Sequence, residues 1–200
     1  RNNIWLSELN FWEAIVNTFP GSSIAQSSIG GVYLNMGQYD EAMQHIDEAI
    51  KTDNANYKAW YNKGVVHLRK GQVAEALTAL NTCIALNEYP KALFTRALVF
   101  QQAQQPLQAL ADIEKVLLQE PENARAWFIK GNCLEQQNSL PEAANCYTKA
   151  IEYSDAEPLF YMRRGIVRRG MGQGGCDDLQ HAVQMGYKPA MQAAAQLCNR

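Results

Sequence analysis

Four arginines within seven residues form the densest charge feature of the chain: Arg163, Arg164, Arg168 and Arg169. In a helix, Arg164 and Arg168 lie one turn apart on the same face. Guanidinium groups placed in this way can bind a phosphate, a sulfate or an acidic peptide. A structural role competes with this hypothesis, because Asp177 or Asp178 could pair with Arg168. We favour the pairing.

A glycine-rich segment follows these arginines, and from Gly170 to Gly175 it formally matches the GxGxxG dinucleotide fingerprint. That fingerprint binds a pyrophosphate only when it joins a strand to a helix within a βαβ unit. Here a helical pattern precedes it, and no strand pattern is visible in the chain. We therefore expect a turn between helices and no dinucleotide cofactor.

Other groups that support catalysis or metal binding are scattered. The three histidines, His45, His67 and His181, have neither the spacing of a metal pair nor a nucleophile beside them. The five cysteines are widely spaced without a CxxC pair, which argues against a zinc site or a disulfide framework. The sequence predicts no catalytic residue, no metal site and no cofactor.

Composition argues against further classes of function. The formal net charge of −2 predicts no general attraction to nucleic acid or membranes. No apolar run approaches the roughly 18 residues that span a bilayer. Because the chain begins at Arg1, we expect a soluble fragment of a longer protein, cytoplasmic or periplasmic.

Short amphipathic helices, repeated every 33 or 34 residues, must position these groups. Small residues recur at this interval: Gly30, Gly64, Ala97, Gly131 and Gly165. Alanines stand twelve residues after the first four: Ala42, Ala76, Ala109 and Ala143. Glycine within a helix costs about 1 kcal/mol relative to alanine, so its recurrence implies that two helix backbones approach closely.

This pattern resembles the tetratricopeptide repeat (TPR), whose 34-residue signature places W-x2-L-G-x2-Y before A-x3-F and P. Tyr57–Tyr89 shows it best, with Trp60, Gly64, Ala76 and Leu80 in signature slots. The resemblance covers about residues 23–185. It implies an all-α fold, a right-handed TPR superhelix (α-solenoid) of about five helix-turn-helix repeats with a flanking helix at each end.

The resemblance also implies boundaries. We expect an N-terminal capping helix or half repeat at residues 1–22, then repeats at 23–56, 57–89, 90–123 and 124–157, a degenerate fifth repeat at 158–186 and a C-terminal capping helix at 187–200. The closing stretch looks like the terminal unit of many bacterial TPR proteins. Its helix could bring Cys198 near Cys176. The two would pair in an oxidising compartment and otherwise be packing thiols, which is the interpretation we favour.

In the TPR family, the first helices of the repeats line a concave groove that holds a peptide. Carried over slot by slot, this implies a groove lined by Lys58, Tyr61, Asn62, Arg69, Lys91, Phe94, Arg125, Phe128, Asn132 and Met162. Such a groove suits a segment with aromatic or aliphatic anchors and some acidic character. Alternatively, the aromatic residues pack between neighbouring first helices.

Two further charge patterns have structural alternatives. Asn62 and Lys91 match two slots of the clamp that holds chaperone tails in some TPR domains, but Ser27, Gly31 and Thr95 fill the other three, so we assign no chaperone tail. A basic row also repeats: Lys63, Arg96, Lys130 and Arg164. It could attract an acidic partner, but we favour pairing with acids of the adjacent repeat.

The first 20 residues, including Trp5 and Trp12, are similar to the segment that joins the membrane region to the repeats in transmembrane O-mannosyltransferase-like proteins. The leading functional hypothesis is a non-catalytic scaffold that binds a peptide or protein segment in the groove. The alternative is a soluble regulatory or substrate-recruiting tail of a membrane-anchored glycosyltransferase-like protein, facing away from the cytoplasm. A third is a homodimer formed through Trp5 and Trp12.

Overall fold

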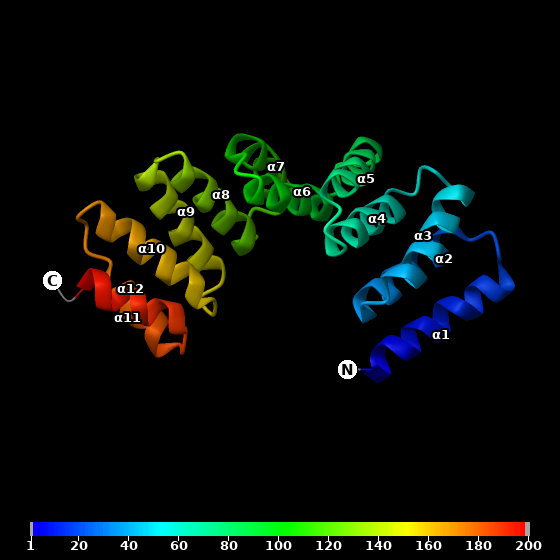
Figure 1. The fold of residues 1–200 in the computed structure, drawn as a ribbon, viewed down its shortest axis with the longest axis horizontal. Coiled ribbons are helices and arrows are strands. Elements are labelled where there is room, and N and C mark those ends of the chain that lie inside the picture. Colours follow the sequence, from blue (N-terminus) through cyan, green and yellow to red (C-terminus); the bar gives the residue numbers. More distant parts are fainter. Residues whose placement is uncertain (1, 199–200) are drawn as a thin grey trace. The chain divides into compact units, whose positions relative to one another are not determined.

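Helices make up the whole architecture. A computed structural model describes residues 2–198, with side chains from Trp5 onward, so residues 1 and 199–200 of the two predicted end segments lie outside the described residues. Between residues 2 and 198 the chain forms twelve α-helices and no strand (Figure 1). The expected all-α class is confirmed. None of these helices is both long enough and apolar enough to cross a membrane.

The chain divides into two compact units, the first ending at Arg96 and the second beginning at Ala97. The first contains α1 (Asn2–Thr18), α2 (Ser23–Met36), α3 (Tyr39–Thr52), α4 (Tyr57–Arg69), α5 (Val73–Leu86) and the start of α6 (Pro90–Gln102). The second contains the rest of α6, then α7 (Pro106–Gln119), α8 (Ala124–Gln136), α9 (Leu140–Tyr153), α10 (Pro158–Gly170), α11 (Cys176–Gln184) and α12 (Lys188–Cys198). The residue limits of the repeats stay a prediction.

Local signals set the ends of these helices. Asn56 and Asn123 each accept a hydrogen bond from a backbone N–H in the first turn of the helix that follows, α4 or α8. Gly37 ends α2 in the left-handed conformation, with φ of 80°, which glycine adopts without a steric penalty. The GxGxxG segment is a turn between α10 and α11, as expected, and Gly172, Gly174 and Gly175 have positive φ.

The recurring glycines lie where two helices of a pair meet. A Cβ atom built on Gly30 would lie 2.6 Å from Cγ1 of Ile46, and one on Gly131 would lie 2.5 Å from Cε1 of Tyr147. Both distances are shorter than any van der Waals contact, so neither position has room for a side chain. The predicted close approach is confirmed at these two pairs.

Helix α1 covers α2 through a small apolar cluster. Leu9, Ile29 and Val32 are buried there, and Trp5 and Trp12 pack against them. The two tryptophans suggested for pairing with a second copy therefore serve the packing of α1. The large apolar side chains that α1 does expose include Leu6 and Phe11, which are 47% and 58% accessible.

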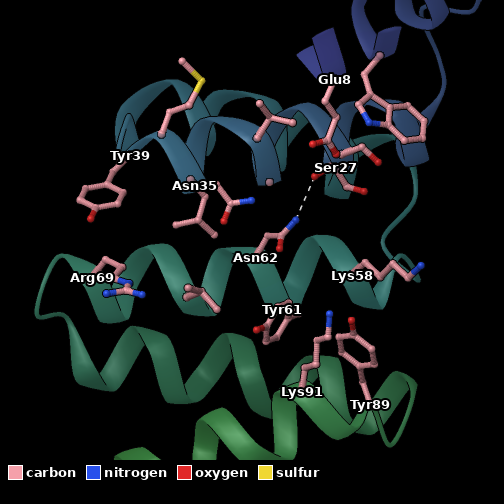
Figure 2. A pocket seen from close by; sticks show the side chains of 18 residues that line it. Glu8, Ser27, Asn35, Tyr39, Lys58, Tyr61, Asn62, Arg69, Tyr89 and Lys91 are labelled. Carbon is pink, nitrogen blue, oxygen red and sulfur yellow. Dashed lines mark hydrogen bonds between the residues drawn. The ribbon is translucent and has the colours of Figure 1, made fainter. Parts of the chain in front are cut away.

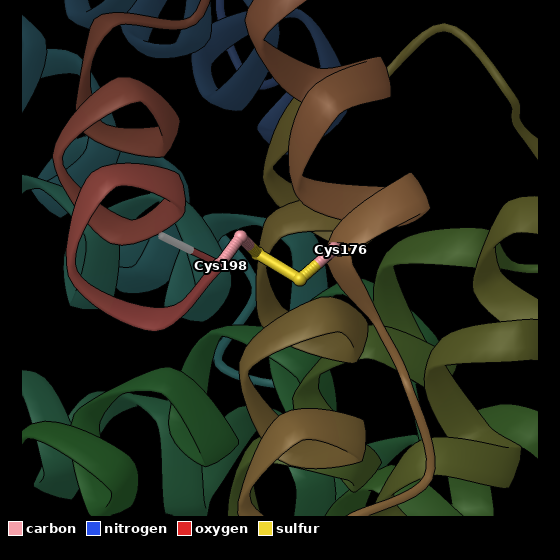
Figure 3. The surroundings of a disulfide bond; sticks show 2 residues. All are labelled: Cys176 and Cys198. Atoms are coloured by element: carbon pink, nitrogen blue, oxygen red, sulfur yellow. A yellow bond between two sulfur atoms is a disulfide. The ribbon is translucent and has the colours of Figure 1, made fainter. Parts of the chain in front are cut away.

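Helix α12 is held to α11 by a disulfide between Cys176 and Cys198, whose Cα atoms are 5.8 Å apart (Figure 3). Our expectation of two unpaired thiols is wrong. The bond joins the first residue of α11 to the last residue of α12, so the two helices run antiparallel. Ala190 is the one fully buried side chain of the described part of α12, so apolar contact holds this helix weakly. A loop of this length gives a disulfide roughly 3 kcal/mol of stabilisation, which explains its use here.

The remaining cysteines, Cys83, Cys133 and Cys146, are free and buried. Burial raises the pKa of Cys83 to about 12 and that of Cys133 to about 11. Since the thiolate is the reacting species, a rise from 9.0 to about 12 lowers the reactive fraction of Cys83 by about a thousandfold. We expect iodoacetamide at pH 8 to leave all three unmodified in the native chain and to modify all three in denaturant. Mass spectrometry without reductant measures this, and rapid native labelling of Cys133 would contradict it.

Candidate functional site

A cavity of about 730 Å³ opens in the first unit, lined by residues of α1, α2 and α4 and by the start of α6 (Figure 2). Five of the predicted groove residues line it: Lys58, Tyr61, Asn62, Arg69 and Lys91. Four come from α4, where Asn56 fixes the start of the helix. Because the α-helix has 3.6 residues per turn, Lys58, Tyr61 and Arg69 share one face of α4. The opposite face, with Ala59 and Gly64, is buried.

The cations of this cavity have no acidic partner within the chain. No ion pair among residues 5–198 involves Lys58, Arg69 or Lys91. The one carboxylate that lines the cavity is that of Glu8, so three positive groups face one negative group. Binding of an acidic group would offset this excess of positive charge.

The basic row behaves differently from these cations. Lys63 pairs with Asp47 at 2.7 Å, and Lys130 pairs with Glu114 at 3.0 Å, in each case on the preceding helix. Arg96 donates to Oδ1 of Asn81 at 2.6 Å. The favoured interpretation, in which this row pairs with the adjacent repeat, is confirmed for the two lysines.

Polar and aromatic groups between the cavity's cations are arranged by contacts within the unit. Nδ2 of Asn62 donates a hydrogen bond to the carbonyl oxygen of Ser27 at 3.0 Å, which bridges α4 and α2 (Figure 2). A Cβ atom on Gly31 would lie 3.3 Å from that Nδ2, so glycine keeps space for the bridge. Tyr89 packs edge-on against Tyr61, with ring centroids 5.3 Å apart.

Sequence reasoning missed several residues of the cavity, including Glu8, Trp12, Asn35, Tyr39 and Tyr89. Asn35 could have been found, because it stands 34 residues before Arg69 and therefore occupies the same slot of the preceding repeat. No comparable signal identifies Glu8 and Trp12, since α1 has no preceding helix pair in this sequence with which to align it.

The other five predicted groove residues do not line this cavity. Phe128 is 9% accessible and stacks on Phe160 with ring centroids 4.8 Å apart, so the packing interpretation holds for it. Asn132 accepts a hydrogen bond from the hydroxyl of Tyr147 at 2.8 Å. Phe94 and Met162 are half-buried, and Arg125 is exposed and lies 3.7 Å from Glu157.

The arginine cluster is engaged by carboxylates. Arg164 donates from Nε and Nη2 to the two oxygens of Asp178, at 2.9 and 2.6 Å, and Arg168 lies 3.4 Å from the same carboxylate. Arg163 pairs with Glu135 at 3.2 Å. The structural pairing is therefore confirmed, with Asp178 as the partner. An added anion would have to compete with these carboxylates, and only Arg169 of the four has no ion pair among the described residues.

Burial and the neighbouring carboxylate raise the pKa of the Tyr147 phenol, which donates to Oε2 of Glu135 at 2.6 Å. This phenol belongs to the interior of the α8–α9 pair. No group of three or more histidine, cysteine, aspartate or glutamate side chains in the described part of the chain could hold a metal ion.

The helix pairs and the lined cavity define a helical-repeat protein. Residues 29–89 and 94–166 match the sequence profile of the tetratricopeptide repeat, so the chain belongs to the TPR family, and its fold is an all-α TPR solenoid. Tetratricopeptide repeat protein 6 of Homo sapiens is 24% identical over 142 residues, which are 71% of this chain and 27% of that protein.

The O-mannosyltransferase resemblance of the first segment also has a counterpart among the relatives. Protein O-mannosyl-transferase TMTC1 of Homo sapiens is 26% identical over 154 residues, 74% of this chain and 17% of that protein. The chain thus spans about a quarter or less of the length of these two relatives. Among solved structures, YrrB, described as a TPR protein with an unusual peptide-binding site, superposes with a TM-score of 0.77 at 17% identity, covering 91% of this chain and 96% of YrrB.

Proposed function

We propose that this chain is a non-catalytic protein-interaction module that binds a peptide or protein segment in the cavity of its first unit. The observation that carries the proposal is the convergence of Lys58, Arg69 and Lys91 on one cavity without an acidic partner among residues 5–198. Membership of the TPR family supports it, as does the peptide-binding site for which YrrB is named.

The chemistry of the cavity favours an acidic segment with an apolar anchor. Lysine and arginine heads that face a shared cavity strengthen the binding of carboxylates by their summed potential. Tyr61 and Tyr89 add rigid aromatic surface, a frequent source of binding energy at protein interfaces. Glu8 disfavours a second acidic group close to its own position.

Selection from a displayed peptide library tests the proposal. We expect the wild-type chain to enrich acidic sequences, and a Lys58→Gln, Lys91→Gln variant to bind the selected peptides at least about tenfold more weakly in fluorescence anisotropy. Lys51→Gln is the control, because its side chain is 77% accessible and pairs with Glu48 at 3.1 Å. Circular dichroism should be unchanged in both variants. If the wild type enriches no sequence, or the double variant binds equally well, the proposal is wrong.

A second candidate rests on the disulfide together with the TMTC1 relative. Disulfides persist in oxidising compartments, so Cys176–Cys198 favours a location outside the cytosol. The alternative function is a substrate-recruiting or regulatory segment of a membrane-anchored glycosyltransferase-like protein. Trapping the thiols in intact cells with N-ethylmaleimide tests this location: the pair should be protected from alkylation, and complete labelling of both would argue against it.

A further inference from the structure

We infer that the ligand of the first-unit cavity is an extended segment with two acidic positions about five residues apart and an apolar residue between them. The inference rests on the proposed function and narrows it, since it names the spacing and backbone form of the ligand. It follows from where the three unpaired cations stand along α4 and at the start of α6.

The cations form two groups at opposite ends of the cavity. Lys58 lies in the first turn of α4 and Arg69 is its last residue, and the sticks in Figure 2 place them at the two ends of the lined surface. Eleven residues separate them, which is about 16.5 Å at the helical rise per residue. Lys91 belongs to the Lys58 group, because Tyr89, two residues before it, packs on Tyr57 at 5.2 Å.

The surface between the two groups carries no charge. Tyr61 and Val65 lie there on α4, and Asn62 lies beside them. The side-chain nitrogen of Asn62 is engaged by Ser27, which leaves its amide oxygen as an acceptor for a backbone N–H of the ligand. An apolar side chain with an exposed backbone N–H therefore suits the middle of the ligand.

The distance between the two groups selects an extended backbone. An extended chain advances about 3.3 Å per residue, so five residues span the separation. An α-helix would need about eleven residues, and at a diameter of about 10 Å it would occupy about 1,300 Å³. The cavity holds about 730 Å³, which accommodates the extended form better.

Synthetic peptides of equal composition test the spacing directly. We would compare acetylated, amidated twelve-residue peptides with one leucine, nine serines or glycines and two glutamates, placed at i and i+1, i and i+5, or i and i+10. Fluorescence anisotropy at low ionic strength should give the tightest binding for i and i+5, by about fivefold over i and i+1, which is the usual strength of one partly exposed ion pair.

Variants assign the two ends. Arg69→Gln should reduce the i and i+5 peptide to the affinity of the i and i+1 peptide, whereas Lys58→Gln with Lys91→Gln should weaken all three. Lys70→Gln is the matched control, because Lys70 is next to Arg69 but pairs with Asp40 away from the cavity. Glu8→Gln should strengthen the binding of every acidic peptide.

The outcomes separate this inference from the proposed function. If the three peptides bind equally, or if Lys70→Gln acts like Arg69→Gln, the spacing is wrong while peptide binding stands. Tightest binding at i and i+10 would overturn the extended backbone in favour of a helical ligand. If none of the three binds although the library yields neutral ligands, the acidic ligand is wrong. If no peptide binds in either experiment, both proposals fail.

Discussion

Replacement of Gly64 by leucine is expected to destabilise the chain by about 3 kcal/mol, at the upper end of the cost of overpacking a core. A Cβ atom at position 64 would lie 2.8 Å from Cγ of Leu80 and 3.3 Å from the carbonyl oxygen of Ala76. The carbonyl belongs to the backbone of α5, so rotation of a side chain cannot remove that contact. The α4–α5 pair must open to accept even the first carbon, and leucine adds three more.

Thermal unfolding followed by circular dichroism measures the effect, and a fall in melting temperature of about 10 °C is expected for a chain of this length. Gly170→Leu is the matched control, because Gly170 also lies in a helix but has no atom within 4 Å of a built Cβ. Leucine there should be neutral or slightly stabilising, since it has the higher helix propensity. Equal melting temperatures for both variants would refute the packing role of Gly64.

The fold could be predicted because its determinants are local and repeated. Gly30, Gly64 and Gly131 each mark a position with no space for a side chain, and their interval alone indicates stacked helix pairs. Helix ends followed in the same way from short-range signals such as Asn56 and Gly37. A repeat gives several independent observations of the same packing rule, which a single non-repeating domain does not offer.

The site could be predicted only in part. Slot periodicity identifies which helix face a residue occupies, and for Lys58, Asn62 and Arg69 that face lines the cavity. It does not report burial, which depends on the neighbouring side chains. Phe128 occupies the same slot as Tyr61, yet Phe160 and Tyr147 cover it. A variant at Phe128 would therefore test the core rather than the groove.

Pairing between distant residues was the least predictable property. The partner of Arg164 could be narrowed to Asp177 or Asp178 by proximity in sequence, but the state of Cys176 and Cys198 could not be fixed. Whether two thiols meet depends on the angle at which α12 returns over α11, and no local signal in the intervening turn sets that angle.

Replacement of Asp178 by alanine is expected to cost about 3 to 5 kcal/mol, the usual cost of leaving a buried charge without its partner. The side chain of Asp178 is 8% accessible and that of Arg164 is 16% accessible. Without the carboxylate, Arg164 keeps only the hydroxyl of Thr148, 3.2 Å from Nη1. A neutral hydroxyl cannot offset the desolvation of a guanidinium group.

Asp177→Ala isolates the ion pair from the general effect of an acidic residue at a helix start. Asp177 and Asp178 both lie in the first turn of α11, where a carboxylate contributes about 0.3 to 1 kcal/mol through the helix dipole. Asp177 is exposed, so its loss should cost no more than that amount. Urea unfolding of the two oxidised variants measures the difference. The double change Arg164→Met with Asp178→Leu should recover most of the stability, because it removes both charges together. If Asp178→Ala is no worse than Asp177→Ala, the arginine does not depend on this carboxylate, and the cluster becomes available to bind an external anion.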